Sequence, residues 1–75
     1  MSPRLPRVTA AQVIRVLDRR GFSLARQSGS HKIYINEAGN RVTVPFHAGK
    51  LLHPKLLARI LVDAELSVEE FMELL

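Results

Sequence analysis

The residues with the clearest chemical potential are six consecutive ones, 27–32, which read Gln-Ser-Gly-Ser-His-Lys. A glycine between two serines is typical of a tight turn, and the stretch after it is rich in β-branched and aromatic residues. His31 therefore stands where a turn is expected to enter a strand. Histidine changes protonation near neutral pH, so it can both accept and donate a proton. The segment predicts a proton-transfer group held at the start of a strand.

RNA is a substrate on which such a group can act with little help, because its 2′-hydroxyl is a built-in nucleophile. An enzyme that moves that proton and stabilises the pentavalent phosphate can cleave RNA without a metal or a cofactor. His31 can be the acid or the base. The cations nearest to it in sequence or across the predicted sheet are Lys32, Arg26 and Arg41, and these can stabilise the phosphate.

A structural role for His31 competes with this hypothesis. Strict alternation places His31 on the same face as Ile33 and Ile35, which we expect to be the core side. A histidine on that side is more often a packed core residue than a catalyst. The start of the strand can, however, project beyond the covering helices, so residue type and spacing leave both interpretations open.

Other candidate contacts lie near this segment. Tyr34, on the opposite parity from Ile33, can stack on a base or cover a half-exposed sheet face, and the sequence favours neither. His47 and Lys50 belong to a later loop and can line a binding cleft. Phe46 is expected to close the edge of the core, and His53 is expected to be an ordinary loop residue.

Metal and cofactor motifs are missing from the sequence. The three histidines are isolated, there is no cysteine, and no carboxylate lies at ligand spacing from an imidazole. The four glycines stand alone, so neither a P-loop nor a dinucleotide-binding motif is present. We expect no metal and no cofactor.

The charges of the chain are strongly segregated. Residues 4–59 hold all eleven basic residues and two acidic ones, a net charge of +9, whereas residues 60–75 hold five acidic residues and no basic one. A concentrated positive charge attracts polyanions. Composition thus favours a nucleic-acid partner but does not separate RNA from DNA.

The elements that position these residues follow from periodicity and capping. Thr9 and Gln12 form a capping box before an apolar helical face that ends near Gly21. Strands are predicted over residues 22–27, 31–36 and 41–45, with Pro45 ending the last one. A second helix is expected to begin at Pro54, and a second capping box, Ser67 with Glu70, opens a short last helix.

These elements predict one α+β domain over residues 1–75, with residues 1–8 as an irregular basic arm. The order is α-β-β-β-α plus a short C-terminal helix. Strands this close in sequence form an antiparallel meander, and two helices cover one face of the sheet. No apolar run is long enough for a signal peptide or a membrane span, so we expect a cytoplasmic protein without a membrane partner.

The chain as a whole resembles the HicA (YcfA-like) toxin family from about Thr9 to Leu75. The resemblance rests on Gly21-Phe22, on 26–34 (Arg-Gln-Ser-Gly-Ser-His-Lys-Ile-Tyr), on 41–50 (Arg-Val-Thr-Val-Pro-Phe-His-Ala-Gly-Lys), and on Ile60-Leu61 together with 66–71 (Leu-Ser-Val-Glu-Glu-Phe). Family members often have Gly-Thr where this chain has Lys55-Leu56, and Ala-Gly-Leu where it has Ala64-Glu65-Leu66.

The resemblance implies a fold like that of the double-stranded RNA-binding domain. It also implies a type II toxin that acts as an mRNA interferase, inhibits translation by cutting RNA, and is neutralised by a HicB-type antitoxin. The family's essential histidine corresponds to His31. Candidate RNA-binding residues are Arg26, Ser30, Lys32, Tyr34, Arg41, His47 and Lys50. The alternative is a basic RNA-binding module without catalytic activity.

Overall fold

The order of elements matches the sequence-based expectation. The computed structural model describes residues 4–75, with α1 (Ala10–Arg19), β1 (Ser23–Ser28), β2 (His31–Ile35), β3 (Arg41–Pro45), α2 (Pro54–Ala64) and α3 (Val68–Leu74). The strands form one antiparallel sheet in the order β1-β2-β3. The predicted α+β fold is confirmed, although β1 begins and ends one residue later than expected. The predicted arm at residues 1–8 is described only from Arg4 onward.

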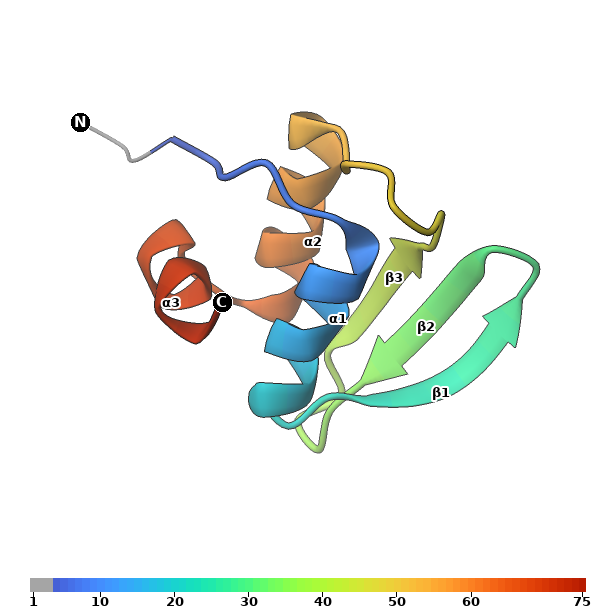
Figure 1. Ribbon diagram of the computed structural model, residues 1–75. Coiled ribbons are helices and arrows are strands. Elements are labelled where there is room, and N and C mark those ends of the chain that lie inside the picture. The colour runs from blue at the N-terminus through green and yellow to red at the C-terminus, as the bar shows by residue number, and fades with distance from the viewer. Residues whose placement is uncertain (1–3) are drawn as a thin grey trace.

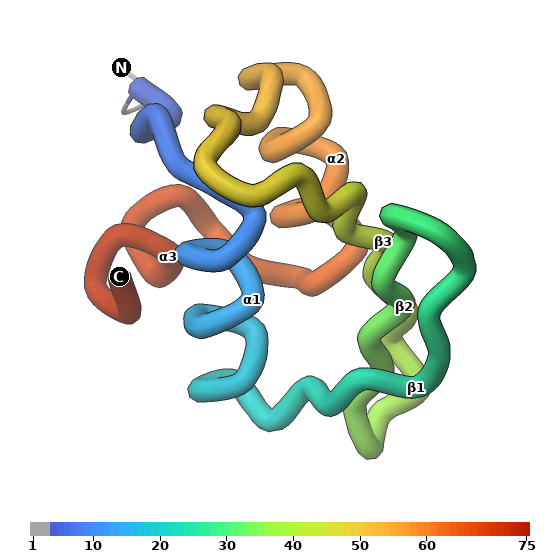
Figure 2. Tube along the Cα trace, turned by 45° about the vertical axis from the view of Figure 1, so that its right-hand side comes forward, coloured from blue at the N-terminus to red at the C-terminus, as the bar shows by residue number. Residues whose placement is uncertain are grey.

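The helices lie to one side of the sheet, and the β1–β2 hairpin projects past them (Figure 1). α1 and α2 pack against β3, and α3 packs against α1 on the side away from the strands (Figure 2). β1 is the strand most distant from the helices, so the outer part of the sheet is left without a helical cover. This layout leaves the hairpin turn accessible to a large ligand.

Both capping boxes are present. Thr9 Oγ1 accepts a hydrogen bond from the Gln12 amide at 3.3 Å, and the Thr9 amide donates to Gln12 Oε1 at 2.8 Å. Ser67 and Glu70 make the equivalent pair of bonds at the start of α3. These contacts satisfy amide groups that a helix leaves unpaired at its first turn. The helix starts that composition predicted are therefore confirmed.

The core lies between the helices and the inner strand. It is made mostly of aliphatic side chains together with Phe22, Tyr34 and Phe71, and Phe71 of α3 is completely buried. Buried residues contributed by α1, β3 and α2 include Val13, Val16, Leu17, Val42, Val44, Leu57, Ile60 and Leu61. Phe46 packs against the edge of this cluster, as predicted.

α2 ends at a residue with a left-handed backbone conformation. Glu65 has φ 56° and ψ 42°, the left-handed conformation in which a helix often ends. Glycine adopts this conformation without strain, whereas residues with a Cβ pay about 1–2 kcal/mol for it. Glycine would therefore suit this position of the backbone better than Glu65 does.

Candidate nucleic-acid interface

The Gly29-Ser30 turn places His31 at the tip of the projecting hairpin. Ser28 and His31 close the turn as paired residues, and Gly29 has φ +58°, which suits the first position of a two-residue hairpin loop. The Ser30 carbonyl accepts a hydrogen bond from the Phe46 amide at 2.7 Å. The turn is thus tied both to β1 and to the chain leaving β3.

His31 lies on the open face of the sheet, so the predicted parity was wrong. Tyr34 is the buried residue of β2, at 7% exposure, and it is paired with the buried Val42. His31 is exposed and Ile35 is 42% exposed, because residues of that parity point away from the helices. The competing interpretation of His31 as a packed core histidine is therefore contradicted.

A bulge in β1 brings two polar side chains to the same face as His31. Leu24 is opposite Tyr34, but Arg26 is opposite Ile33, so Ala25 is an extra residue without a partner. A one-residue shift reverses the face to which each following side chain points. Arg26 therefore joins the open face. Ser28, two residues further along β1, also lies on this face, directly opposite His31.

The partner of His31 on the other side is Pro45. Ser30 and Phe46 form the adjacent hydrogen-bonded pair, so His31 and Pro45 occupy a non-hydrogen-bonded position, where Cα atoms are about 4.5 Å apart. The missing N–H of proline costs nothing at such a position. Pro45 is accordingly the last residue of β3, as predicted.

Two of the predicted RNA-binding residues face the helices instead. Lys32 is paired with Val44 and holds its Nζ 4.1 Å from the centre of the Phe46 ring. Tyr34 is buried in the core, so neither base stacking nor cover of a half-exposed face describes it. Neither side chain shares a face with His31.

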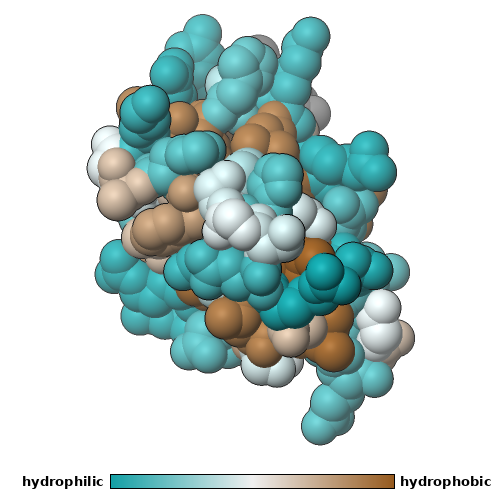
Figure 3. Space-filling view, turned by 90° about the vertical axis from the view of Figure 1, so that its right-hand side faces the viewer, coloured by the Kyte–Doolittle hydropathy of each residue, from teal (hydrophilic) through white to brown (hydrophobic). Residues whose placement is uncertain are grey.

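Arg41 does share the open face, but at its far end. It is paired with Ile35, four residues along β2 from His31, which corresponds to about 13 Å of strand. Between them lie Ile33 and Thr43, so the open face alternates apolar and polar groups. Figure 3 shows this mixture on the side where the hairpin projects, with small apolar patches among hydrophilic side chains.

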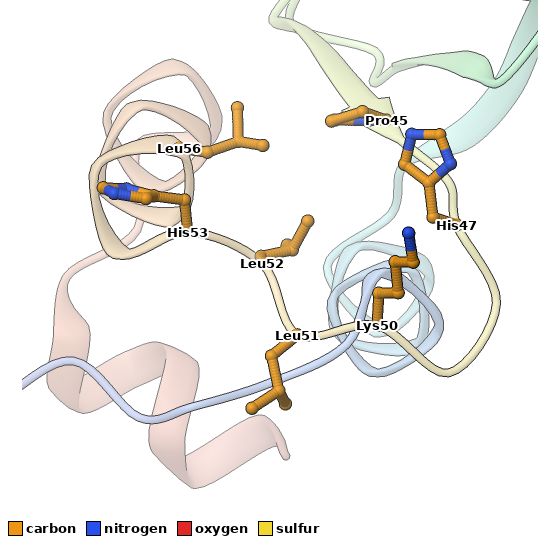
Figure 4. Close-up of a pocket in the computed structure, with 7 residues that line it drawn as sticks. All are labelled: Pro45, His47, Lys50, Leu51, Leu52, His53 and Leu56. Atoms are coloured by element: carbon orange, nitrogen blue, oxygen red, sulfur yellow. The ribbon is translucent and has the colours of Figure 1, made fainter.

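His47 and Lys50 lie in the loop after β3 and line a pocket of about 240 Å³ (Figure 4). The Lys50 amide donates to the His47 carbonyl at 3.1 Å, which closes a turn between them. His53 lines the same pocket, and its Nδ1 accepts a hydrogen bond from the Lys55 amide as the N-cap of α2. His53 is therefore a helix cap and not an ordinary loop residue.

The arginines near the acidic C-terminal part differ in their partners from those on the open face of the sheet. Arg20 pairs with Glu70 at 3.5 Å, Arg59 pairs with Asp63 at 3.2 Å, and Arg19 donates to the Leu74 carbonyl. The contacts of Arg20 and Arg19 join the end of α1 to α3, and the Arg59–Asp63 pair lies within α2. Within residues 4–75, Arg26 and Arg41 on the open face form no ion pair. Arg26 and Arg41 therefore leave positive charge on the open face of the sheet that a polyanion can meet.

Sequence reasoning missed two features of this site. The position of Ser28 opposite His31 was missed, because the alternation of side chains in the sequence does not indicate the bulge at Ala25. A cleft lined by His47 and Lys50 was anticipated, but its apolar wall was not, because Leu52 and Leu56 are assigned by composition to a loop and a helix. A histidine directly before a proline at a helix start was the one available signal for the cap at His53.

Two searches of the described chain were negative. Among residues 4–75, no group of three or more His, Cys, Asp or Glu side chains is placed to hold a metal ion. In the same range, none of the helices combines the length and the apolar character that crossing a bilayer requires.

Comparison with known proteins gives a family for this fold and this hairpin. A search of curated proteins found no match. The family model described as the HicA toxin of bacterial toxin-antitoxin systems matches residues 10–66, which include α1, the whole sheet and α2. α3 follows the matched region. Because the match covers well over half of the 75 residues, the chain belongs to the HicA toxin family.

Proposed function

We propose that this toxin is an mRNA interferase that cleaves RNA in the cytoplasm through His31, needs no metal, and is neutralised by a HicB-type antitoxin. The observation that carries the proposal is the exposure of His31 on the open face of the projecting hairpin, near Arg26, which forms no ion pair within residues 4–75. Membership of a toxin family supports a cognate antitoxin as the partner.

The reaction that suits this arrangement is internal transfer at the phosphate. The 2′-hydroxyl oxygen attacks phosphorus, the bond to the 5′-oxygen breaks, and the products are a 2′,3′-cyclic phosphate and a 5′-hydroxyl. His31 either takes the proton from the 2′-hydroxyl or gives one to the leaving oxygen. Arg26, on the same face, is placed to stabilise the extra negative charge on the phosphate.

The set of residues that we propose to contact RNA is smaller than the set predicted from the sequence. Arg26, Ser30, His47 and Lys50 surround the hairpin turn or the adjoining loop, and Arg41 extends the same face. Lys32 can reach RNA only around the edge of the sheet, since it lies over Phe46. Tyr34 is left out, because its ring is in the core.

The decisive experiment compares the unaltered protein with His31→Ala. Induced expression of the unaltered protein should arrest growth and degrade mRNA, and the purified protein should cut RNA in the presence of EDTA. His31→Ala should reduce cleavage by at least about a hundredfold, as expected when a proton-transfer group is removed. Its thermal unfolding should be unchanged, since an exposed residue contributes little to stability.

The outcomes separate this proposal from the alternative. Cleavage products with 2′,3′-cyclic phosphate ends, lost when the 2′-hydroxyl at the cut is replaced by hydrogen, support the mechanism. Salt-sensitive RNA binding without products at any protein concentration would instead identify a non-catalytic RNA-binding module. Undiminished cleavage by His31→Ala would refute the role of this histidine.

A further inference from the structure

The pocket beside the hairpin combines an apolar wall with basic groups. Its lining comes from the end of β3, from the loop over residues 46–53 and from the first turn of α2: Pro45, His47, Lys50, Leu51, Leu52, His53 and Leu56. In Figure 4, His47 and Lys50 extend toward Pro45 on one side, His53 and Leu56 lie on the other, and Leu51 points away. None of these seven lining residues is acidic.

The walls of this pocket are held by hydrogen bonds to two neighbouring segments. The Leu52 amide donates to the Val8 carbonyl at 2.8 Å, and Leu51 forms a bridge with Thr9, so the loop is tied to the segment before α1. The His53 ring is held by its bond to the Lys55 amide at 3.1 Å. A cavity with fixed walls binds a ligand at a lower cost in conformational entropy than a mobile loop does.

Pro45 makes the pocket continuous with the site around His31. This residue is a wall of the pocket and also the cross-strand partner of His31. Side chains at such a position are direct neighbours. A ligand that lies in the pocket and extends over Pro45 therefore reaches His31 without crossing another element of the fold.

We propose that this pocket binds one unpaired base of the RNA strand, while the phosphate next to that base lies at His31. The base of a nucleotide has flat apolar faces that suit Pro45 and Leu56. Two phosphates flank each nucleotide of the strand, so one can lie at His31 while the other suits Lys50. Single-stranded RNA offers such bases, whereas a duplex keeps them stacked. The inference rests on the proposed function and deepens it, because it makes the base beside the cut a determinant of the cleavage site.

The test uses the whole protein and the four nucleoside 5′-monophosphates as probes. Two-dimensional NMR of the leucine methyl groups follows each titration at low ionic strength. We expect saturable shifts at Leu52 and Leu56, which line the pocket, and smaller ones at Leu24, which is exposed on β1. The four nucleotides should differ in affinity, since their bases fill the pocket differently.

A matched pair of variants measures the contribution of charge. Lys50→Gln removes a cation from the pocket, whereas Lys55→Gln makes the same chemical change at an exposed residue outside the lining. We expect Lys50→Gln to raise the dissociation constant about fivefold and Lys55→Gln to leave it within about twofold, because one charge-assisted contact to phosphate is lost only in the former.

The outcomes keep this inference distinct from the proposed function. Shifts confined to the sheet, or equal weakening by Lys50→Gln and Lys55→Gln, would overturn the base pocket even if the protein cuts RNA through His31. Saturable binding at Leu52 and Leu56 in a protein that never cuts RNA would support the pocket and refute the nuclease.

Discussion

The two faces of the sheet differ in what their residues do. On the helix-facing side, Tyr34, Val42 and Val44 are 7%, 0% and 0% exposed and form part of the core. On the open side, His31 and Arg26 are exposed and are free of ion pairs within residues 4–75. One face therefore maintains the fold and the other is available for a ligand, although they belong to the same three strands.

Comparing the two faces shows which strand determines the side of the sheet that the helices cover. In β2 alone the open side carries the two isoleucines, Ile33 and Ile35, and looks more apolar than the side of Tyr34. In β3 the alternation is unambiguous, because Val42 and Val44 point one way and Arg41 and Thr43 the other. Paired residues of neighbouring strands point to the same side of the sheet. The side of β3 that packs against the helices therefore determines which side of β2 is buried.

The largest effect is expected from truncating neighbouring residues on the two faces of β3. Val44→Ala removes two buried methyl groups and leaves a cavity, so it should lower the free energy of unfolding by about 2–3 kcal/mol. Thr43→Ala should cost less than about 1 kcal/mol, because it loses only the strand preference of a β-branched residue. Urea denaturation followed by circular dichroism measures both.

Strand preference is lost in both of these variants, so their difference isolates burial. For a domain of this size, the extra loss should lower the melting temperature by about 10 °C. Equal destabilisation by the two variants would contradict the assignment of faces. It would mean that the side of Thr43 is covered in solution.

A smaller effect is expected from the two arginines of the open face. If His31 is the catalytic residue, Arg26→Gln should slow cleavage of a short RNA by at least about tenfold, since it removes a cation near the reacting phosphate. Arg41→Gln should leave that rate within about twofold, because Arg41 is about 13 Å of strand away. Each variant should lower the salt dependence of binding to longer RNA by about one unit.

Comparing a short RNA with a longer one tests whether Arg26 and Arg41 have different roles. A short RNA occupies only the hairpin end, so it should distinguish the two arginines, whereas a longer RNA should engage both. If Arg41→Gln slowed cleavage of the short RNA as much as Arg26→Gln, the reacting phosphate would have to lie near the middle of the face rather than at the tip.

Helix starts were predictable from the sequence because they depend on local chemistry. Thr9 with Gln12 and Ser67 with Glu70 satisfy amides within their own first turns, and these bonds are present. The hairpin turn was predictable because glycine next to serine between two strands leaves few alternatives. The predicted strands left residues 28–30 for this turn, and its loop is Gly29-Ser30 because β1 continues to Ser28.

The faces of the sheet were not predictable, because they depend on contacts between distant residues. The bulge at Ala25 arises from pairing between β1 and β2 and reverses the direction of Arg26 and Ser28. Tyr34 is buried because Val42 beside it packs toward the helices. No local pattern in the sequence records these relationships, so the candidate site was found through His31 while its neighbours were partly misassigned.

The smallest expected effect is a pH dependence of stability caused by Tyr34, the only tyrosine in the sequence, which lies on the helix-facing side of the sheet. Burial raises the pKa of Tyr34 above its usual 10.0, and the negative charge of Asp18 raises it further. The unfolded chain therefore releases the phenolic proton at lower pH than the folded protein does. The resulting stabilisation is complete below pH 10 and is lost as pH rises through the pKa of the folded protein.

Tyr34→Phe should abolish this part of the alkaline loss of stability. Because the chain has one tyrosine, near-ultraviolet absorbance during an alkaline titration reports this phenol alone. Asp18→Asn should shift the titration back toward lower pH, since it removes the second cause of the shift. A phenol that ionises at the ordinary pH of free tyrosine would show that Tyr34 is solvated, and the helix-facing side of β2 would then have to be reassigned.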